Sequence, residues 1–171
     1  MQQKDPKYNF IGDSIITRWP LDQTFPSQLV YNYGKSGSGI TYLEPFAGRF
    51  NGEQVVVMMG TNDFPKFYQE NIDTYVAHYL QTISALTDKT VYLFSVLPRQ
   101  FKGDPVDVNI IIALFNDRVK KDISDYPNIK YIDVYDDFLD GDHINYQYYS
   151  DGLHLSTYGY EILTSKLIDT F

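Results

Sequence analysis

Five short runs of apolar residues recur along the chain, and each run is nearly continuous rather than alternating with polar residues. Most of the side chains in these runs are β-branched or aromatic. This pattern is typical of strands that are covered on both faces, as in a parallel sheet. The predicted strands are residues 8–11, 29–33, 55–59, 91–96 and 129–134.

Apolar residues at helical spacing lie between the later runs. One set predicts a helix before the fourth strand, and a second set predicts a helix that begins near Asp104-Pro105, a dipeptide that suits a helix N-terminus. A third helix is expected from about Ser156, as its N-cap, to near the end of the sequence. Strands that alternate with helices predict an α/β domain with right-handed crossovers. The apolar positions are Ile72, Tyr75, Val76, Tyr79, Leu80, Ile83 and Leu86 in the first helix, and Ile111, Leu114, Phe115 and Val119 in the second.

The composition adds limits on the class of protein. The 171 residues, 43% of them hydrophobic, predict a single domain over residues 1–171. The net charge is −8, which argues against a nucleic acid or an anionic membrane surface as partner, because both require a positive footprint. The chain has no cysteine, so disulfides, thiolate catalysis and cysteine-based zinc sites are excluded.

The sequence gives no sign of a membrane segment or a leader. No apolar run approaches the roughly 20 residues needed to span a bilayer. The opening residues, MQQKDPKYN, have no apolar core and do not resemble a signal peptide. We therefore expect a cytoplasmic protein, unless an export signal has been removed from the chain.

Polar residues follow four of the predicted strands. In an open α/β sheet, sites form outside the carboxyl ends of the strands, so these residues are expected to meet at one edge. They comprise a serine, a glycine-rich loop, an amide side chain, and a histidine close to a carboxylate. The segments are Gly12-Asp13-Ser14, residues 32–39, Gly60-Thr61-Asn62-Asp63, and residues 150–156 with Asp151 and His154.

This set of groups meets the needs of acyl transfer. A serine hydroxyl becomes a good nucleophile only when a base takes its proton. Imidazole can do so near neutral pH, and a carboxylate can hold its tautomer. Asp151 and His154 are three residues apart, close enough in a turn for the carboxylate to reach Nδ1. Backbone N–H groups of Ser14 and Gly37 and the amide of Asn62 could serve as oxyanion donors.

These motifs resemble those of the SGNH, or GDSL-type, hydrolase superfamily, in order and in position. The resemblance implies a flavodoxin-like three-layer α/β fold of about five parallel strands, and a serine esterase that needs no cofactor and no metal. It implies that Ser14 is the nucleophile, His154 the base and Asp151 the residue that orients the base. It further implies an oxyanion hole of Ser14, Gly37 and Asn62, with Asp13, Gly60 and Asp63 in supporting positions.

Two positions in the glycine-rich loop leave choices open. Gly37 is assigned to the oxyanion hole by its offset from Asn32, and Gly34 is the alternative if the loop aligns differently. The family has isoleucine or valine before the serine at position 36, where this chain has Lys35. That departure predicts a cation at the rim of the site.

Several of these residues also have simpler interpretations. A lone Gly-Asp-Ser is more often a turn or a helix cap than a nucleophile, and Asn62 alone would be a turn residue. His78 is expected on a helix face, and His143 in a solvated acidic loop. The segment 33–36 lacks the first glycine of a phosphate-binding loop, and the acidic run 136–142 lacks the spacing of an EF-hand.

The substrate expected from the sequence is a small-molecule or carbohydrate ester. The acidic charge and the 16 tyrosines favour a short acyl group, such as acetyl, on a sugar or another small polar alcohol, although most tyrosines are expected to serve packing. One alternative is a lysophospholipase or acyl-thioesterase that prefers longer acyl chains. Another, from a different class, is a carbohydrate-binding module on a hydrolase scaffold.

Overall fold

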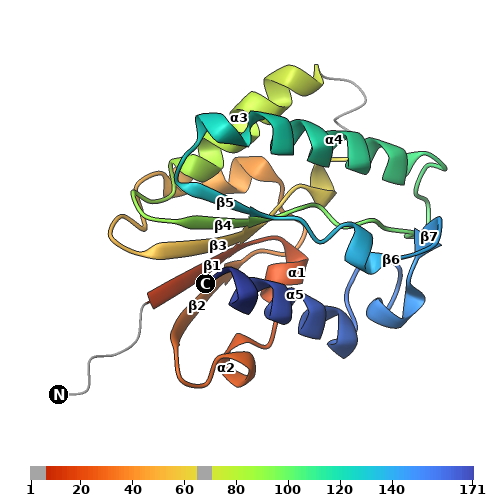
Figure 1. Ribbon diagram of the computed structural model, residues 1–171, viewed down its shortest axis with the longest axis horizontal. Coiled ribbons are helices and arrows are strands. Elements are labelled where there is room, and N and C mark those ends of the chain that lie inside the picture. Colours follow the sequence, from red (N-terminus) through yellow and green to blue (C-terminus); the bar gives the residue numbers. More distant parts are fainter. Residues whose placement is uncertain (1–6, 65–70) are drawn as a thin grey trace.

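The computed structural model describes residues 7–64 and 71–171. Its centre is a sheet of parallel strands in the order β2-β1-β3-β4-β5 (Figure 1). The predicted parallel sheet is therefore confirmed, with strand ends that differ only slightly from those expected. The strands are β1 (Lys7–Gly12), β2 (Leu29–Gly34), β3 (Gln54–Met58), β4 (Val91–Phe94) and β5 (Ile129–Ile132).

Helices cover both faces of the sheet and give the domain three layers. The helices α3 (Ile72–Ser84) and α4 (Val108–Asp122) lie on the upper face in Figure 1. The helices α1 (Ser14–Thr17), α2 (Leu21–Thr24) and α5 (Thr157–Thr170) lie below it. This arrangement confirms the expected α/β class. Ser156 caps α5 as predicted, because its hydroxyl accepts a hydrogen bond from the N–H of Gly159.

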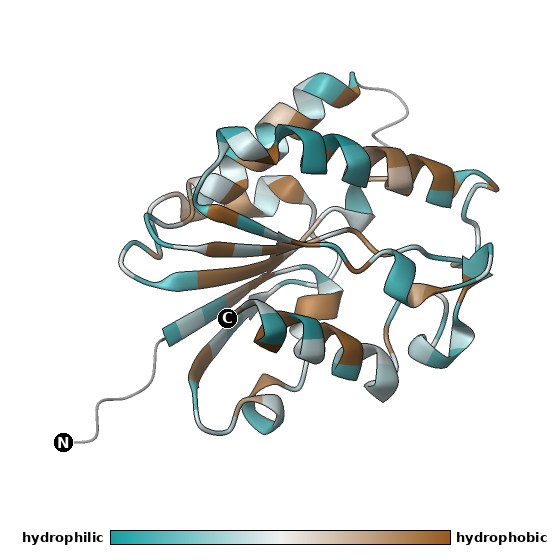
Figure 2. Ribbon diagram, in the orientation of Figure 1, coloured by the Kyte–Doolittle hydropathy of each residue, from teal (hydrophilic) through white to brown (hydrophobic). Residues whose placement is uncertain are grey.

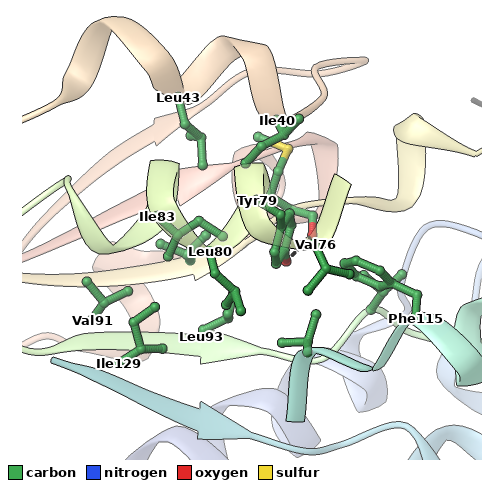
Figure 3. Packing of buried hydrophobic residues seen from close by; sticks show 14 of the residues in the cluster. Ile40, Leu43, Val76, Tyr79, Leu80, Ile83, Val91, Leu93, Phe115 and Ile129 are labelled. Carbon is green, nitrogen blue, oxygen red and sulfur yellow. Dashed lines mark hydrogen bonds between the residues drawn. The ribbon is translucent and has the colours of Figure 1, made fainter. Parts of the chain in front are cut away.

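Two apolar clusters, one on each face of the sheet, form the core. On the upper face, Tyr79 and Val76 of α3 point toward Phe115 of α4, and Leu80 points toward Leu93 in the sheet (Figure 3). The second cluster packs α1, α2 and α5 against the opposite face. Apolar residues accordingly concentrate in the central strands, and polar residues along the outer sides of the helices (Figure 2).

The helix expected after Asp104-Pro105 begins later than predicted, at Val108. The Asp104 carboxylate does not cap a helix there; it accepts hydrogen bonds from the Arg99 side chain and the N–H of Phe101. The predicted apolar face of this helix was also partly wrong, since Leu114 is 56% exposed. Spacing alone cannot distinguish the buried face from a neighbouring apolar position.

Several short elements had no clear signal in the sequence. A 3₁₀ helix, Ile40–Phe46, follows the glycine-rich loop, and another, Thr61–Asp63, follows β3. The acidic segment expected to be a loop contains a 3₁₀ turn, Asp136–Phe138, and a two-stranded hairpin of β6 (Leu139–Asp140) and β7 (His143–Ile144). Further single turns are Ile123–Asp125 and Tyr146–Tyr148.

The register of the sheet brings the polar segments to one edge. Gly12, the last residue of β1, is opposite Gly34 of β2 and Met58 of β3. The three strands therefore end level with one another. In an open α/β sheet this edge is where ligands bind, especially where neighbouring strands connect in opposite directions. Here β1 lies between β2 and β3. The chain therefore passes from β1 to β2 on one side of β1 and then crosses to β3 on the other side.

Candidate active site

Ser14 lies at the corner where β1 gives way to α1. Asp13 is the N-cap of α1, and its carboxylate accepts a hydrogen bond of 2.9 Å from the N–H of Ile15. This cap starts the helix immediately after the strand. Ser14 is the first residue of α1 and is only 5% exposed. Its backbone N–H lies in the first turn, where a helix has no internal acceptors.

A chain of hydrogen bonds connects Ser14 to a histidine and a carboxylate. His154 Nε2 is 3.1 Å from Ser14 Oγ, and His154 Nδ1 is 2.7 Å from Asp151 Oδ2. The second carboxylate oxygen of Asp151 accepts from the backbone N–H of His154 at 2.7 Å and of Leu153 at 3.0 Å. The structure therefore brings together the three residues that the sequence analysis placed in a triad, although Ser14 is 140 residues from His154 in the sequence.

The hydrogen bonds to Asp151 also set its ionisation. Burial acts to raise the pKa of the carboxyl, but the bonds from the His154 side chain and from two backbone N–H groups outweigh it and hold the pKa at about 2. Asp151 is therefore ionised throughout the neutral range. An ionised carboxylate on Nδ1 fixes the imidazole tautomer in which Nε2 can accept a proton from Ser14.

The glycine-rich loop after β2 approaches the same edge. Gly34 belongs to β2, and its N–H donates to the side chain of Asn32 at 2.8 Å. Gly37 has a φ of +77°, a conformation that favours glycine. Within residues 7–64 and 71–171, the Gly37 N–H makes no hydrogen bond. Lys35 is exposed, with Nζ 5.5 Å from the centre of the Tyr42 ring.

Asn62 and Asp63 tie the segment after β3 to that loop. The side-chain amide of Asn62 donates to the Ser38 carbonyl at 3.0 Å. Asp63 is buried, and its carboxylate accepts a 3.0 Å bond from the N–H of Ile40 and another from the Tyr75 hydroxyl. Gly60, the residue that precedes this turn, is also buried. Asp63 thus holds the start of the 3₁₀ helix after the glycine-rich loop in place.

Asp13 is a second buried carboxyl next to the serine. It is 1% exposed, and its Oδ2 has no hydrogen-bond partner among the described residues. Burial is the main cause that raises its pKa, to about 7, and the nearby carboxylate of Asp63 adds to the effect. Asp13 borders a cavity of about 10 Å³, also lined by Thr61 and Leu153. The cavity has room for the centre of about one water molecule.

Arg99 is a structural part of this edge that the sequence analysis missed. Its guanidinium donates to the carbonyl and hydroxyl oxygens of Thr61 at 2.8 and 3.1 Å. It also forms a two-pronged ion pair with Asp104, with N–O distances of 2.5 and 3.0 Å. Both side chains are largely buried. Arg99 therefore connects the segment after β4 to the turn that carries Asn62.

The other two histidines are paired with other residues and not with Ser14. His78 Nε2 is 2.9 Å from Glu44, and His143 Nε2 is 3.3 Å from Asp142; both histidine side chains are about half exposed. Across the described ranges, 7–64 and 71–171, no cluster of three or more histidine, aspartate or glutamate side chains could hold a metal ion. In the same ranges, no helix is both long and apolar enough to cross a membrane.

Residues 10–162 match the model of the GDSL-like lipase/acylhydrolase family. No curated protein matches the chain. Among solved structures, a Streptococcus pneumonia protein whose name refers to platelet activating factor is 26% identical, with a TM-score of 0.76 over 99% of this chain and 86% of its own.

Two further structures share the fold at lower identity. A GDSL-like lipase from Bacteroides thetaiotaomicron is 22% identical, with a TM-score of 0.76 over 98% of this chain and 88% of its own. An acetyl xylan esterase from Geobacillus stearothermophilus is 18% identical, with a TM-score of 0.69 over 97% of this chain and 94% of its own.

Proposed function

This chain belongs to the GDSL-like lipase/acylhydrolase family and is an ester hydrolase, and we propose that it cleaves short-acyl carboxylic esters, such as O-acetyl esters, of a carbohydrate or another small polar alcohol. The hydrogen-bonded series Ser14–His154–Asp151 is the observation that carries the proposal. In a buried nucleophile, a 3.1 Å contact to an oriented imidazole is the arrangement that general-base catalysis requires.

The proposed reaction has two steps. Ser14 Oγ attacks the ester carbonyl carbon while its proton moves to His154 Nε2, and the tetrahedral intermediate collapses when that proton passes to the departing alcohol oxygen. Water then attacks the acyl-enzyme, again giving a proton to His154, and Ser14 is regenerated with release of the carboxylic acid. Asp151, ionised, stabilises the imidazolium in both steps.

Three donors are proposed for the oxyanion: the N–H groups of Ser14 and Gly37 and the amide of Asn62. Gly37 is favoured over Gly34 because the Gly34 N–H is already bonded to Asn32. The Asn62 amide nitrogen carries two hydrogens, and Ser38 takes only one. Donors that are held in place before the reaction stabilise the developing charge without reorganising.

The preference for a short acyl group follows the sequence expectation of a small polar substrate, which rests on the net charge of −8 and the 16 tyrosines. The similarity to an acetyl xylan esterase agrees with a small acyl group. A lysophospholipase or thioesterase, the alternative function, would instead prefer longer acyl chains.

Hydrolysis of p-nitrophenyl esters from acetate to decanoate, by the native protein and by Ser14→Ala, tests the proposal. We expect the highest kcat/KM for acetate, and a loss of at least about 10³-fold in the variant. Rates that rise with chain length would replace the short-acyl proposal with the lipolytic alternative. Full activity in Ser14→Ala would refute the proposed nucleophile.

A further inference from the structure

The segment that follows β4 packs directly against the turn that carries the proposed catalytic base. The N–H of Gln100 donates to the Gly152 carbonyl at 2.9 Å. Gly152 has a φ of +84°, and a Cβ there would collide with the carbonyl oxygen of Gln100. Because only glycine permits this approach, residues 99–104 lie beside Asp151 and His154 as a fixed wall.

Phe101 is the member of this wall that faces His154. The two rings meet edge to face, with centroids 6.4 Å apart and planes at 85°. Phe101 remains 37% exposed, so a substantial part of the ring is open to solvent. An aromatic ring next to the base and open to solvent offers a ligand an apolar contact surface.

A groove of about 460 Å³ continues from Phe101 and runs between residues 99–109 and the β6–β7 hairpin. Its lining combines apolar and hydrogen-bonding groups, which is the mixture that fixes and orients a small ligand. The Tyr146 hydroxyl donates to Gln100 Oε1 at 2.7 Å, and within residues 7–64 and 71–171 the amide nitrogen of Gln100, with its two hydrogens, has no acceptor. The lining includes Gln100, Phe101, Pro105, Asn109, Asp142 and His143.

The direction of the proposed reaction assigns this groove to one half of the substrate. His154 gives its proton to the departing alcohol oxygen, so the alcohol must leave from the side of the imidazole. Phe101 borders that side, whereas the carbonyl oxygen of the ester faces the oxyanion donors. The alcohol half of the ester therefore extends past Phe101 toward the groove.

We propose that this groove is the subsite for the alcohol moiety and that it takes a neutral, polyhydroxylated ring, that is, a sugar. The inference rests on the proposed esterase function and deepens it. The Phe101 ring packs against the C–H face of the sugar, and the Gln100 amide and the Asp142 carboxylate bind hydroxyl groups. Asp142 is almost fully exposed, with Oδ1 3.3 Å from His143 Nε2, and the net charge of −8 of the chain disfavours a phosphorylated or otherwise anionic alcohol.

The test compares two acetates that each carry one acetyl group and differ only in the alcohol: ethyl acetate and a mono-O-acetylated methyl xylopyranoside, followed in a pH-stat. The measured quantity is the ratio of kcat/KM for the sugar acetate to kcat/KM for ethyl acetate. We expect Phe101→Ala to lower this ratio about tenfold, the scale of one lost aromatic contact, and Phe101→Trp to restore most of it. Tyr158→Ala is the control, because Tyr158 is an exposed aromatic residue of α5 outside the groove.

The possible outcomes separate the subsite from the function itself. An unchanged ratio in Phe101→Ala, with both rates equally reduced, would mean that Phe101 only positions His154 and would overturn the subsite. A native protein that cleaves ethyl acetate but not the sugar acetate would overturn the sugar class. A native protein that cleaves neither would overturn the proposed function, and the subsite with it.

Discussion

The side-chain amide of Asn62 donates a hydrogen bond to the backbone carbonyl of Ser38 over 3.0 Å. Asn62 comes from the turn after β3, and Ser38 from the loop after β2. The bond therefore joins two of the three segments that supply the proposed oxyanion hole. The bond also fixes the orientation of the planar amide group, and with it the direction of the second N–H.

Replacing Asn62 with alanine should remove one oxyanion donor. We expect kcat for p-nitrophenyl acetate to fall about 10²–10³-fold with little change in KM, because the donor acts mainly on the charge of the transition state. Asn62→Asp keeps the shape but donates no hydrogen bond, and should lose as much. Near-native kcat in the aspartate variant would rule out the amide as a donor.

Replacing Asp151 with asparagine should leave the turn intact but impair the base. We expect kcat to fall by about 10²–10⁴, because the neutral amide neither fixes the tautomer of His154 nor stabilises its charged form. The pKa of Asp151 is about 2, so its stabilising effect is present above the unfolded-state pKa near 4 and is lost only as pH falls toward 2. The native pH–rate profile should therefore show no Asp151 titration between pH 5 and 9. Equal kcat for the variant and the native protein at pH 8 would contradict this role.

The parts that the sequence predicted are those that local pattern determines. The buried strands are visible as apolar runs, such as 55–59, because both of their faces are covered. The turn with Asp151 and His154 is visible because a carboxylate three residues before an imidazole can reach its Nδ1 within a single turn. Right-handed, uncrossed connections leave few possible strand orders, and the order that forms places the ends of these segments at one edge of the sheet.

Asp13 offers a pH-dependent test of stability. Its folded-state pKa of about 7 is raised mainly by burial, so the folded protein keeps a proton that the unfolded chain loses near pH 4. The favourable contribution is complete below pH 4 and is lost as pH rises to 7. Asp13→Asn does not titrate, so its melting temperature relative to the native protein should rise from pH 4 to 7 and then level off. A difference that stays constant over this range would mean that Asp13 is ionised in the folded state.

The ion pair of Arg99 and Asp104 should contribute far more than an exposed pair. Arg99→Ala leaves the buried Asp104 carboxylate without its partner and should lower the free energy of unfolding by about 3–5 kcal/mol. Arg118→Ala removes ion pairs with Asp73 and Asp122 that are more exposed to solvent, and it should lower the free energy of unfolding by less than about 1 kcal/mol. Urea unfolding of both variants gives the comparison. Equal losses would mean that the buried pair of Arg99 and Asp104 contributes no more than the exposed one.

The features that the sequence did not predict depend on contacts between distant segments. Nothing in the residues around Arg99 signals that its guanidinium reaches Thr61, because the two segments meet only after β3 and β4 pair. The Asp-Pro dipeptide predicts a helix start at Asp104, but in the fold the Asp104 carboxylate accepts hydrogen bonds from the Arg99 guanidinium and the Phe101 N–H. The sequence likewise does not predict the role proposed for Phe101, because that role depends on the position of its ring beside His154.

The central claim is that Ser14 is the nucleophile of an acyl-enzyme mechanism. The most direct measurement is covalent labelling with a fluorophosphonate, followed by intact mass and peptide mapping of the native protein, Ser14→Ala and His154→Ala. The account predicts one adduct, on the peptide that contains Ser14, which is absent in Ser14→Ala and forms far more slowly in His154→Ala. An adduct on another residue, or equal labelling of Ser14→Ala, would contradict it.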